Sequence, residues 1–284
     1  MGKLKEAFQQ ITAGGSAGLV EVCVMHPLDV MKTRLQLGSQ FYKGLGDVFR
    51  KTLTEEGIRG FYKGIIPPII AETPKRATKF LTFEQYKHAF QSFHGIPEWG
   101  QISLAGAAAG LTEACVNTPF ELVKVRLQSD RSKTNIKTSR QVAKEVLNTR
   151  GIRGIYTALG ATMYRNGTWN CIYFGLYHNV KPLLPTDPVQ NLLSRMGVGF
   201  CAGTIASVAN IPFDVVKSRI QAQAEGTQWK YRNTWQAIGL VYKEEGIAAL
   251  YRGIVPKVMR LGPGGAIMLI VFETVNDFLK KIMD

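Results

Sequence analysis

The sequence predicts an all-α membrane protein made of three copies of one unit, with two long helices in each copy. A ten-residue pattern occurs three times, as PLDVMKTRLQ (27–36), PFELVKVRLQ (119–128) and PFDVVKSRIQ (212–221). The copies begin 92 and 93 residues apart, so the 284 residues read as three repeats. Six mostly apolar segments of about 20 to 29 residues are each long enough to cross about 30 Å of hydrocarbon.

The first long segment of each repeat contains small residues followed by the proline of the pattern. GGSAG (14–18), GAAAG (106–110) and GFCAG (199–203) each begin 13 residues before that proline. Small residues four apart let two helix backbones approach closely, which is typical of helix packing in lipid. A helix crossing in a soluble protein is the alternative. The helical pattern continues beyond the proline, which predicts a kink.

A short amphipathic helix and a second long helix complete each repeat. The short segments, 44–57, 138–151 and 233–246, each end at a glycine, as capped helices do. The second long segments cover about 65–90, 159–182 and 254–279. We therefore expect repeats 1–97, 98–188 and 189–284 that form one transmembrane domain together.

The charges indicate how the helices are oriented. The formal net charge is +14, which indicates anionic partners, either small molecules, anionic lipid or nucleic acid. The segments between the two helices of a repeat carry seven, nine and six Lys or Arg, whereas those between repeats carry one and two. All three basic segments are therefore expected on one side of the membrane and both termini on the other.

The sequence contains no signal for an enzyme, a metal site or a cofactor. The four cysteines lie in apolar stretches without CxxC spacing, so buried thiols are expected. Neither a Ser/His/Asp set nor a phosphate-binding loop can be recognised, and the glycines serve turns and helix packing.

These motifs resemble those of the mitochondrial carrier family over essentially the whole chain. Each P-x-[DE]-x-x-[KR]-x-[RK] motif is followed by an acidic-Gly and aromatic-basic-Gly element, as in EGIRGFYKG (56–64); the middle copy departs, with RGIRGIYTA (150–158). The resemblance implies six tilted helices around a central cavity, alternating access and short helices on the matrix side. It also implies the inner mitochondrial membrane, with termini toward the intermembrane space. One chain supplies the whole threefold barrel, so a monomer suffices.

Two rings of polar residues are expected to close the cavity. An acid and a lysine three residues apart can form a solvated pair on one helix. The resemblance implies instead that each acid pairs with the lysine of the neighbouring helix and that a glutamine braces the pair. This matrix gate comprises Asp29, Lys32, Gln36, Glu121, Lys124, Gln128, Asp214, Lys217 and Gln221.

The cytoplasmic ring should be weaker, because only FEQYK (83–87) has the complete aromatic-acidic-x-x-basic pattern. His178 replaces the acid in YHNVK, and Asn276 replaces the base in FETVN. We expect one full ion pair, Lys181 with Glu273. Lys87 would then face His178, and Glu84 would face Asn276.

The expected substrate site lies midway along the second helices. Positions that match the family's contact points are occupied by Arg165, Asn166 and Arg260, and the charged residues Glu72, Lys75 and Lys79 lie near the equivalent place in repeat 1. Two arginines can each hold a carboxylate through two hydrogen bonds, and Asn166 can donate to a keto oxygen. Glu72 is expected to pair with a cation, or else to take part in proton coupling or bind an amino group.

The substrate is therefore predicted to be a dicarboxylate. AETPKRATKF and RLGPGGAIML resemble the family members that exchange 2-oxodicarboxylates, such as 2-oxoadipate and 2-oxoglutarate, and Arg165-Asn166 argues against adenine nucleotides. A citrate-type tricarboxylate or an amino acid is the alternative within the family. A soluble basic repeat protein that binds nucleic acid is a remote alternative, because the basic residues lie in loops between apolar helices rather than along one face.

Overall fold

The computed structural model describes residues 2–38, 41–92, 95–130, 137–180, 184, 188–223 and 229–283. Six long helices lie in this part of the chain. They are α1 (Gly2–Gln36), α3 (Ile66–Gln91), α4 (Glu98–Ser129), α6 (Leu159–Val180), α7 (Pro188–Ala222) and α10 (Ile254–Met283). The all-α fold with two long helices in each repeat is confirmed.

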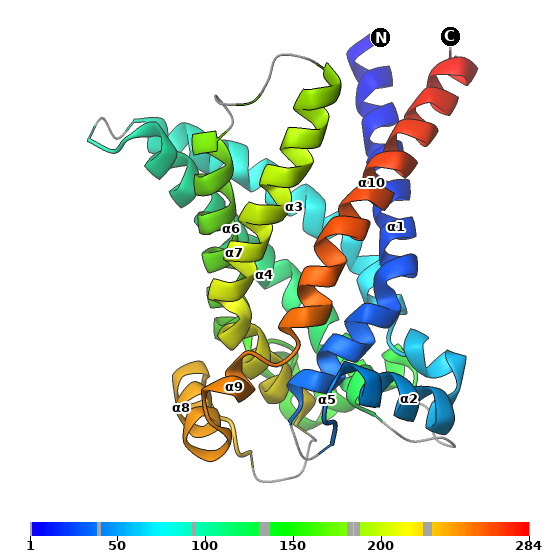
Figure 1. Cartoon of the computed structure of the whole chain (residues 1–284), viewed down its shortest axis with the longest axis vertical. Helices are drawn as coiled ribbons and strands as arrows, with labels where there is room; N and C mark the ends of the chain where they lie inside the picture. Colours follow the sequence, from blue (N-terminus) through cyan, green and yellow to red (C-terminus); the bar gives the residue numbers. More distant parts are fainter. Residues whose placement is uncertain are drawn as a thin grey trace.

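The long helices form a barrel in chain order (Figure 1). α4 packs along both α3 and α6, α6 packs along α7, and α10 returns to pack along α1. Both termini lie at one end of the barrel, and the short helices lie at the other end (Figure 1). The two ends of the barrel are therefore built from different elements.

The short helices end where the sequence predicts. α2 (Leu45–Glu56) and α8 (Thr234–Glu245) are followed by Gly57 and Gly246, whose φ angles are 68° and 78°. α5 (Ser139–Ile155) contains Gly151 with φ 64°, where its regular helix stops. This left-handed conformation favours glycine, because a Cβ would crowd the following carbonyl oxygen. Two one-turn elements, η1 (Ile58–Tyr62) and α9 (Ile247–Leu250), follow α2 and α8.

The small residues of α4 allow a close helix contact, as predicted, whereas a Cβ at Gly14 of α1 would meet no atom within 4 Å. A Cβ at Gly106 would lie 2.6 Å from the Phe174 ring, and one at Gly110 would lie 2.5 Å from the Asn170 amide nitrogen. α4 can therefore approach α6 closely only because these positions lack side chains. α1, α4 and α7 each continue on both sides of their proline.

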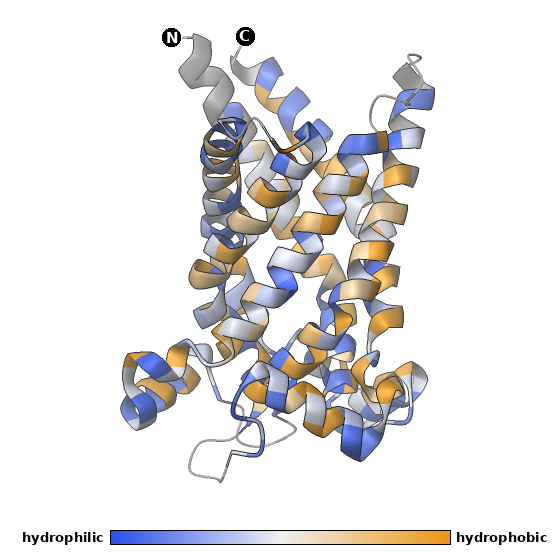
Figure 2. Cartoon of the chain, turned by 90° about the vertical axis from the view of Figure 1, so that its left-hand side faces the viewer, coloured by the Kyte–Doolittle hydropathy of each residue, from blue (hydrophilic) through white to orange (hydrophobic). Residues whose placement is uncertain are grey.

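The outer surface of the barrel is apolar, which suits a lipid environment. Figure 2 shows hydrophobic residues along the helices of the barrel, and large exposed side chains there include Val24, Ile70, Leu81, Ile205 and Ile270. Within the described residues, Ser194–Ala222 and Ile247–Lys281 are apolar enough to cross a membrane by composition alone.

Candidate substrate cavity and its gates

Three ion pairs between neighbouring helices close the barrel near the short helices. Lys124 of α4 lies 2.6 Å from Asp29 of α1, and Lys217 of α7 lies 2.5 Å from Glu121 of α4. Lys32 of α1 pairs with Asp214 of α7 and completes the ring. The structure thus places each acid beside the lysine on the first long helix of the next repeat. We call these six residues the acid–lysine ring.

Each acid of the ring also has a second cation, which comes from the second long helix of a repeat. Arg260 of α10 lies 2.6 Å from Asp29, and Arg165 of α6 lies 2.8 Å from Glu121. Lys257 of α10 lies 3.2 Å from Asp214. The two arginines expected to bind substrate are therefore held by ring acids in this structure.

The three glutamines lie beneath the ring and are almost completely buried. Gln36 accepts a hydrogen bond from Ser218 Oγ at 2.8 Å, and the amide of Gln221 donates to the Thr157 carbonyl at 3.4 Å. Gln128 is packed against Gly64, where φ is 73°. The side-chain amide of Gln128 has no hydrogen-bond partner in the described part of the chain, and none of the three glutamines hydrogen-bonds a ring lysine there.

A threefold set of arginine hydrogen bonds beneath the ring was not predicted from the sequence. The Arg two residues after each ring lysine donates to the carbonyl of the glutamine in another repeat. The bonds are Arg34 to Gln128 (3.2 Å), Arg126 to Gln221 (3.2 Å) and Arg219 to Gln36 (2.9 Å). They join the last turns of α1, α4 and α7 beneath the ring. The fixed Lys-x-Arg-x-Gln spacing is the signal that could have revealed it.

Acids of the short helices hold two of these arginines. Glu56 lies 2.7 Å from Arg34, and Glu245 pairs with Arg219. Burial alone would raise the pKa of Glu56, but hydrogen bonds from Arg34 and Lys63 outweigh it and keep the pKa below its usual value. The middle repeat has Arg150 at the equivalent place, and its guanidinium lies 3.9 Å from the Trp229 ring centre.

Two neighbouring cavities that share lining residues lie above the ring. The large cavity, of about 780 Å³, extends from Asp29 and Arg260 toward Tyr177 and Arg195. The small cavity, of about 170 Å³, is lined by Arg165, Asn166 and Lys79, among others. Lys32, Trp169 and Lys257 line both cavities. A ligand at their junction can contact cations on both sides.

The small cavity contains a donor without a partner. Asn166 is 8% exposed; its Oδ1 accepts from Arg165 at 2.8 and 3.0 Å, but its Nδ2 has no hydrogen-bond partner in the structure. Lys257, which sequence reasoning missed, hydrogen-bonds Asn210 and Asp214. Asn210 in turn donates to the Arg165 carbonyl at 3.3 Å, so it joins α7 to α6 and α10. A lysine inside an apolar helix was the available signal for Lys257.

Glu72, Lys75 and Arg76 of α3 form one ion-pair network. Both carboxylate oxygens of Glu72 are engaged, one by Lys75 at 2.7 Å and the other by Arg76. Arg76 also reaches Glu21 at 3.4 Å, and Glu21 lies 2.8 Å from Arg260. Glu72 is therefore a partner of cations, the simpler of the roles expected for it, and is not free for an amino group.

Lys79 lies apart from that network. Its Nζ lies 5.4 Å from the Trp169 ring centre and 5.7 Å from the Phe174 ring centre, within range of cation–π attraction. Among the described residues it has no ion-pair partner within 4 Å. Lys79 thus remains available to an anion in the small cavity.

In the described part of the chain, no ion pair of the expected cytoplasmic ring is formed. Glu84 and Glu273 are exposed, and the acid nearest His178 is Glu98, at 3.8 Å. No ion pair joins Glu84, Lys87, His178 or Glu273 to one another, and Lys87 and Asn276 are partly exposed; Lys181 lies outside the described residues. The barrel is therefore closed at the end with the short helices.

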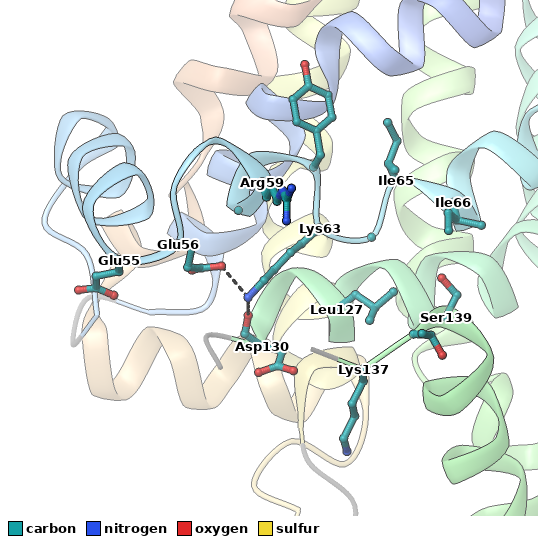
Figure 3. A pocket seen from close by; sticks show the side chains of 14 residues that line it. Glu55, Glu56, Arg59, Lys63, Ile65, Ile66, Leu127, Asp130, Lys137 and Ser139 are labelled. Atoms are coloured by element: carbon teal, nitrogen blue, oxygen red, sulfur yellow. Dashed lines mark hydrogen bonds and ion pairs between the residues drawn. The ribbon is translucent and has the colours of Figure 1, made fainter. Parts of the chain in front are cut away.

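A separate cavity of about 520 Å³ lies at the closed end, between η1, α4 and α5 (Figure 3). Lys63 crosses it to Glu56 at 2.6 Å and to the Asp130 carbonyl at 3.1 Å (Figure 3). Arg59 and Lys137 add positive charge to its wall. None of its lining residues belongs to the acid–lysine ring, so it is not part of the central path.

Comparison with known proteins gives a consistent result along the whole chain. Residues 3–94, 97–188 and 189–283 each match the model of the family described as mitochondrial carrier protein. The chain is 49% identical to the mitochondrial 2-oxodicarboxylate carrier of Bos taurus, over 99% of this chain and 97% of the relative. The carrier of the same name from Homo sapiens is 49% identical, over 98% and 96%. Mitochondrial citrate transporter D of Aspergillus niger is 41% identical, over 96% and 94%.

Proposed function

The chain belongs to the mitochondrial carrier family and is a transporter, and we propose that it exchanges 2-oxodicarboxylates such as 2-oxoglutarate and 2-oxoadipate. The observation that carries the proposal is the pair of arginines beside the cavities. Arg165 and Arg260 face the site from α6 and α10, and each is bound to a carboxylate of the ring. A substrate carboxylate can replace that partner with the same hydrogen-bond geometry.

Such a replacement links substrate binding to gate opening. When a dicarboxylate takes both arginines, Asp29 and Glu121 each lose a cation and keep only a ring lysine. The closed ring is then less stable. A modest difference in substrate affinity between the two conformations can shift the population toward the opposite one. In that state, Lys181 with Glu273, Lys87 with His178 and Glu84 with Asn276 would close the cytoplasmic side.

The charge balance supports exchange rather than one-way passage. The charged groups that line the two cavities and the ring include more cations than carboxylates. An unpaired charge is costly inside a membrane-spanning bundle, by at least a few kcal/mol. The empty carrier therefore has a barrier to closing both gates, and a bound dianion reduces it by supplying the missing negative charge.

A citrate-type substrate is the second candidate. One relative is named a citrate transporter, and Lys79 and Lys257 are cations beyond the two arginines. The 2-oxodicarboxylate assignment remains our first choice, because relatives of that name are more similar to this chain. Transport of an amino acid has less support, since the carboxylate of Glu72 is already paired.

We place the protein in the inner mitochondrial membrane as a monomer, with both termini toward the intermembrane space. The basic short-helix end would then face the matrix, which agrees with the charge difference between the two sets of loops. Anionic lipid is a suitable neighbour for the Arg59 and Lys137 cavity at that end.

Uptake of labelled 2-oxoglutarate into proteoliposomes tests the proposal. Separate batches would contain 2-oxoadipate, 2-oxoglutarate, citrate, glutamate, ADP or nothing. We expect rapid uptake against the two oxo acids, and its loss in Arg165→Ala and Arg260→Ala. Uptake driven mainly by citrate or glutamate would overturn the substrate assignment, and no exchange by folded protein would overturn the assignment of the site.

A further inference from the structure

We infer that the substrate binds in one orientation, with its 2-oxo carboxylate end in the small cavity and its other carboxylate in the large cavity. The inference rests on the proposed function and goes beyond it by assigning each end of the molecule. It also assigns Lys257 as a residue that determines specificity. The two cavities share the wall formed by Lys32, Trp169 and Lys257, so one molecule can extend across their junction.

The small cavity has the donors that a 2-oxo acid requires. That end of the substrate carries three acceptor oxygens close together, two on the carboxylate and one on the keto group. Arg165 can hold the carboxylate, and the buried Nδ2 of Asn166 beside it lacks an acceptor. Leaving a buried donor unsatisfied costs about 1–3 kcal/mol, so a bound acceptor there is favoured.

Lys257 adds a further donor beside Arg165. The two oxygens of Asp214 join them: Arg165 approaches Oδ1 at 3.6 Å and Lys257 approaches Oδ2 at 3.2 Å. A lysine ammonium has three N–H donors, and Asn210 and Asp214 accept from Lys257. The remaining donor can reach a keto or carboxylate oxygen held by Arg165.

The large cavity is suited to the simple carboxylate and to a chain of variable length. Arg260 is the guanidinium at its base, and its fork matches one carboxylate. The cavity is several times larger than the small one and has open space beside Gly265, where a Cβ would meet no atom within 4 Å. Substrates that differ by one methylene are therefore expected to differ in this cavity while the 2-oxo end binds in the same way.

Substrate selectivity provides the first test. Exchange would be measured with 2-oxoglutarate, glutarate, which lacks the keto group, and 2-oxoadipate. We expect Lys257→Met to reduce the preference for 2-oxoglutarate over glutarate by about ten-fold or more, the range for a hydrogen bond that involves a charged group. Asn166→Leu should reduce it by about two- to ten-fold, the range for a hydrogen bond between neutral groups. Lys257→Arg, which keeps a donor, should retain most of the preference.

A matched variant in the large cavity should change the selectivity for substrate length and not the selectivity for the keto group. Gly265→Leu is expected to reduce exchange of 2-oxoadipate relative to 2-oxoglutarate and to leave the preference for the keto group intact. If Asn166→Leu and Lys257→Met reduce 2-oxoglutarate and glutarate exchange equally, the small cavity does not recognise the keto group and the inference is wrong.

A binding measurement tests the orientation separately. 2-Oxovalerate has the 2-oxo acid end but no second carboxylate, and a ligand that binds the folded state raises its melting temperature. We expect 2-oxovalerate to stabilise the wild type and Arg260→Met but not Arg165→Met. Loss of the shift in Arg260→Met would overturn the orientation. Failure of the wild type to exchange 2-oxoglutarate would instead refute the proposed function.

Discussion

Removing the negative charge of Glu121 should strengthen substrate binding, because that carboxylate competes with the substrate for Arg165. The two groups are 2.8 Å apart, and both are largely buried. Their gross Coulomb attraction is about 6 kcal/mol at an effective dielectric constant of about 20. Desolvation offsets most of it, and a charge-assisted hydrogen bond contributes about 1.5–3 kcal/mol net. Glu121→Gln should therefore lower the dissociation constant of 2-oxoglutarate by about 10- to 100-fold.

Titration calorimetry on the purified protein would measure this change, and Glu113→Gln is the matched control. Glu113 lines the small cavity, and Glu113→Gln removes the same charge as Glu121→Gln. Among the described residues, Glu113 makes no ion pair within 4 Å. Removal of its charge should change affinity less than Glu121→Gln does, because Glu113 makes no ion pair with Arg165 that the substrate must displace. Equal gains in the two variants would mean that net charge, rather than displacement of a ring acid, controls binding. Weaker binding in Glu121→Gln would refute the competition outright.

Three further predictions concern the closed end. Arg34→Met should lower the free energy of unfolding by about 3–5 kcal/mol in a denaturant titration, because it breaks a buried ion pair with Glu56, whereas exposed Arg140→Met should have little effect. Gly253→Ala should destabilise the protein more than Gly246→Ala: both have φ near 80°, but only Gly253 has a backbone oxygen, that of Lys32, 3.2 Å from the added Cβ. An equal loss of stability in the two variants would show that the contact with the Lys32 carbonyl oxygen is unimportant. Because the pKa of Glu56 is lowered by folding, its contribution is present above about pH 4.3, its ordinary pKa, and is lost as the pH falls through the folded-state value. The stability difference between wild type and Glu56→Gln should therefore narrow in acid, and a constant difference would contradict this.

Much of the fold could be predicted because the repeat constrains it three times. The long helices follow from apolar length, and the ends of the short ones follow from glycines that adopt positive φ. One difference between the repeats is visible in the sequence, but its structural result could not be predicted. Ala158 occupies the position of Gly64 and Gly253 and adopts φ 65°. Its strained conformation depends on the packing of the middle repeat, which the sequence does not display.

The sequence predicted most residues of the site but not all of the contacts between them. The ring residues share a spacing, so their presence together could be expected. The pairing of Arg165 and Arg260 with ring acids could not be predicted, because it depends on how far α6 and α10 tilt into the barrel. Lys257 was missed for a related reason: it has no counterpart in the other repeats, and its partner Asn210 lies 47 residues away.

The most direct test of the gating account is the distance between the short helices with and without substrate. Spin labels at exposed Thr54 of α2 and Lys243 of α8, in a protein whose native cysteines are replaced, report on the closed end. We expect 2-oxoglutarate to add a second, longer distance in otherwise wild-type protein, but not when Arg165→Met or Arg260→Met is present. An unchanged distance in a carrier that exchanges 2-oxoglutarate, or the same change in the arginine variants, would contradict the claim that substrate opens the ring by taking its arginines.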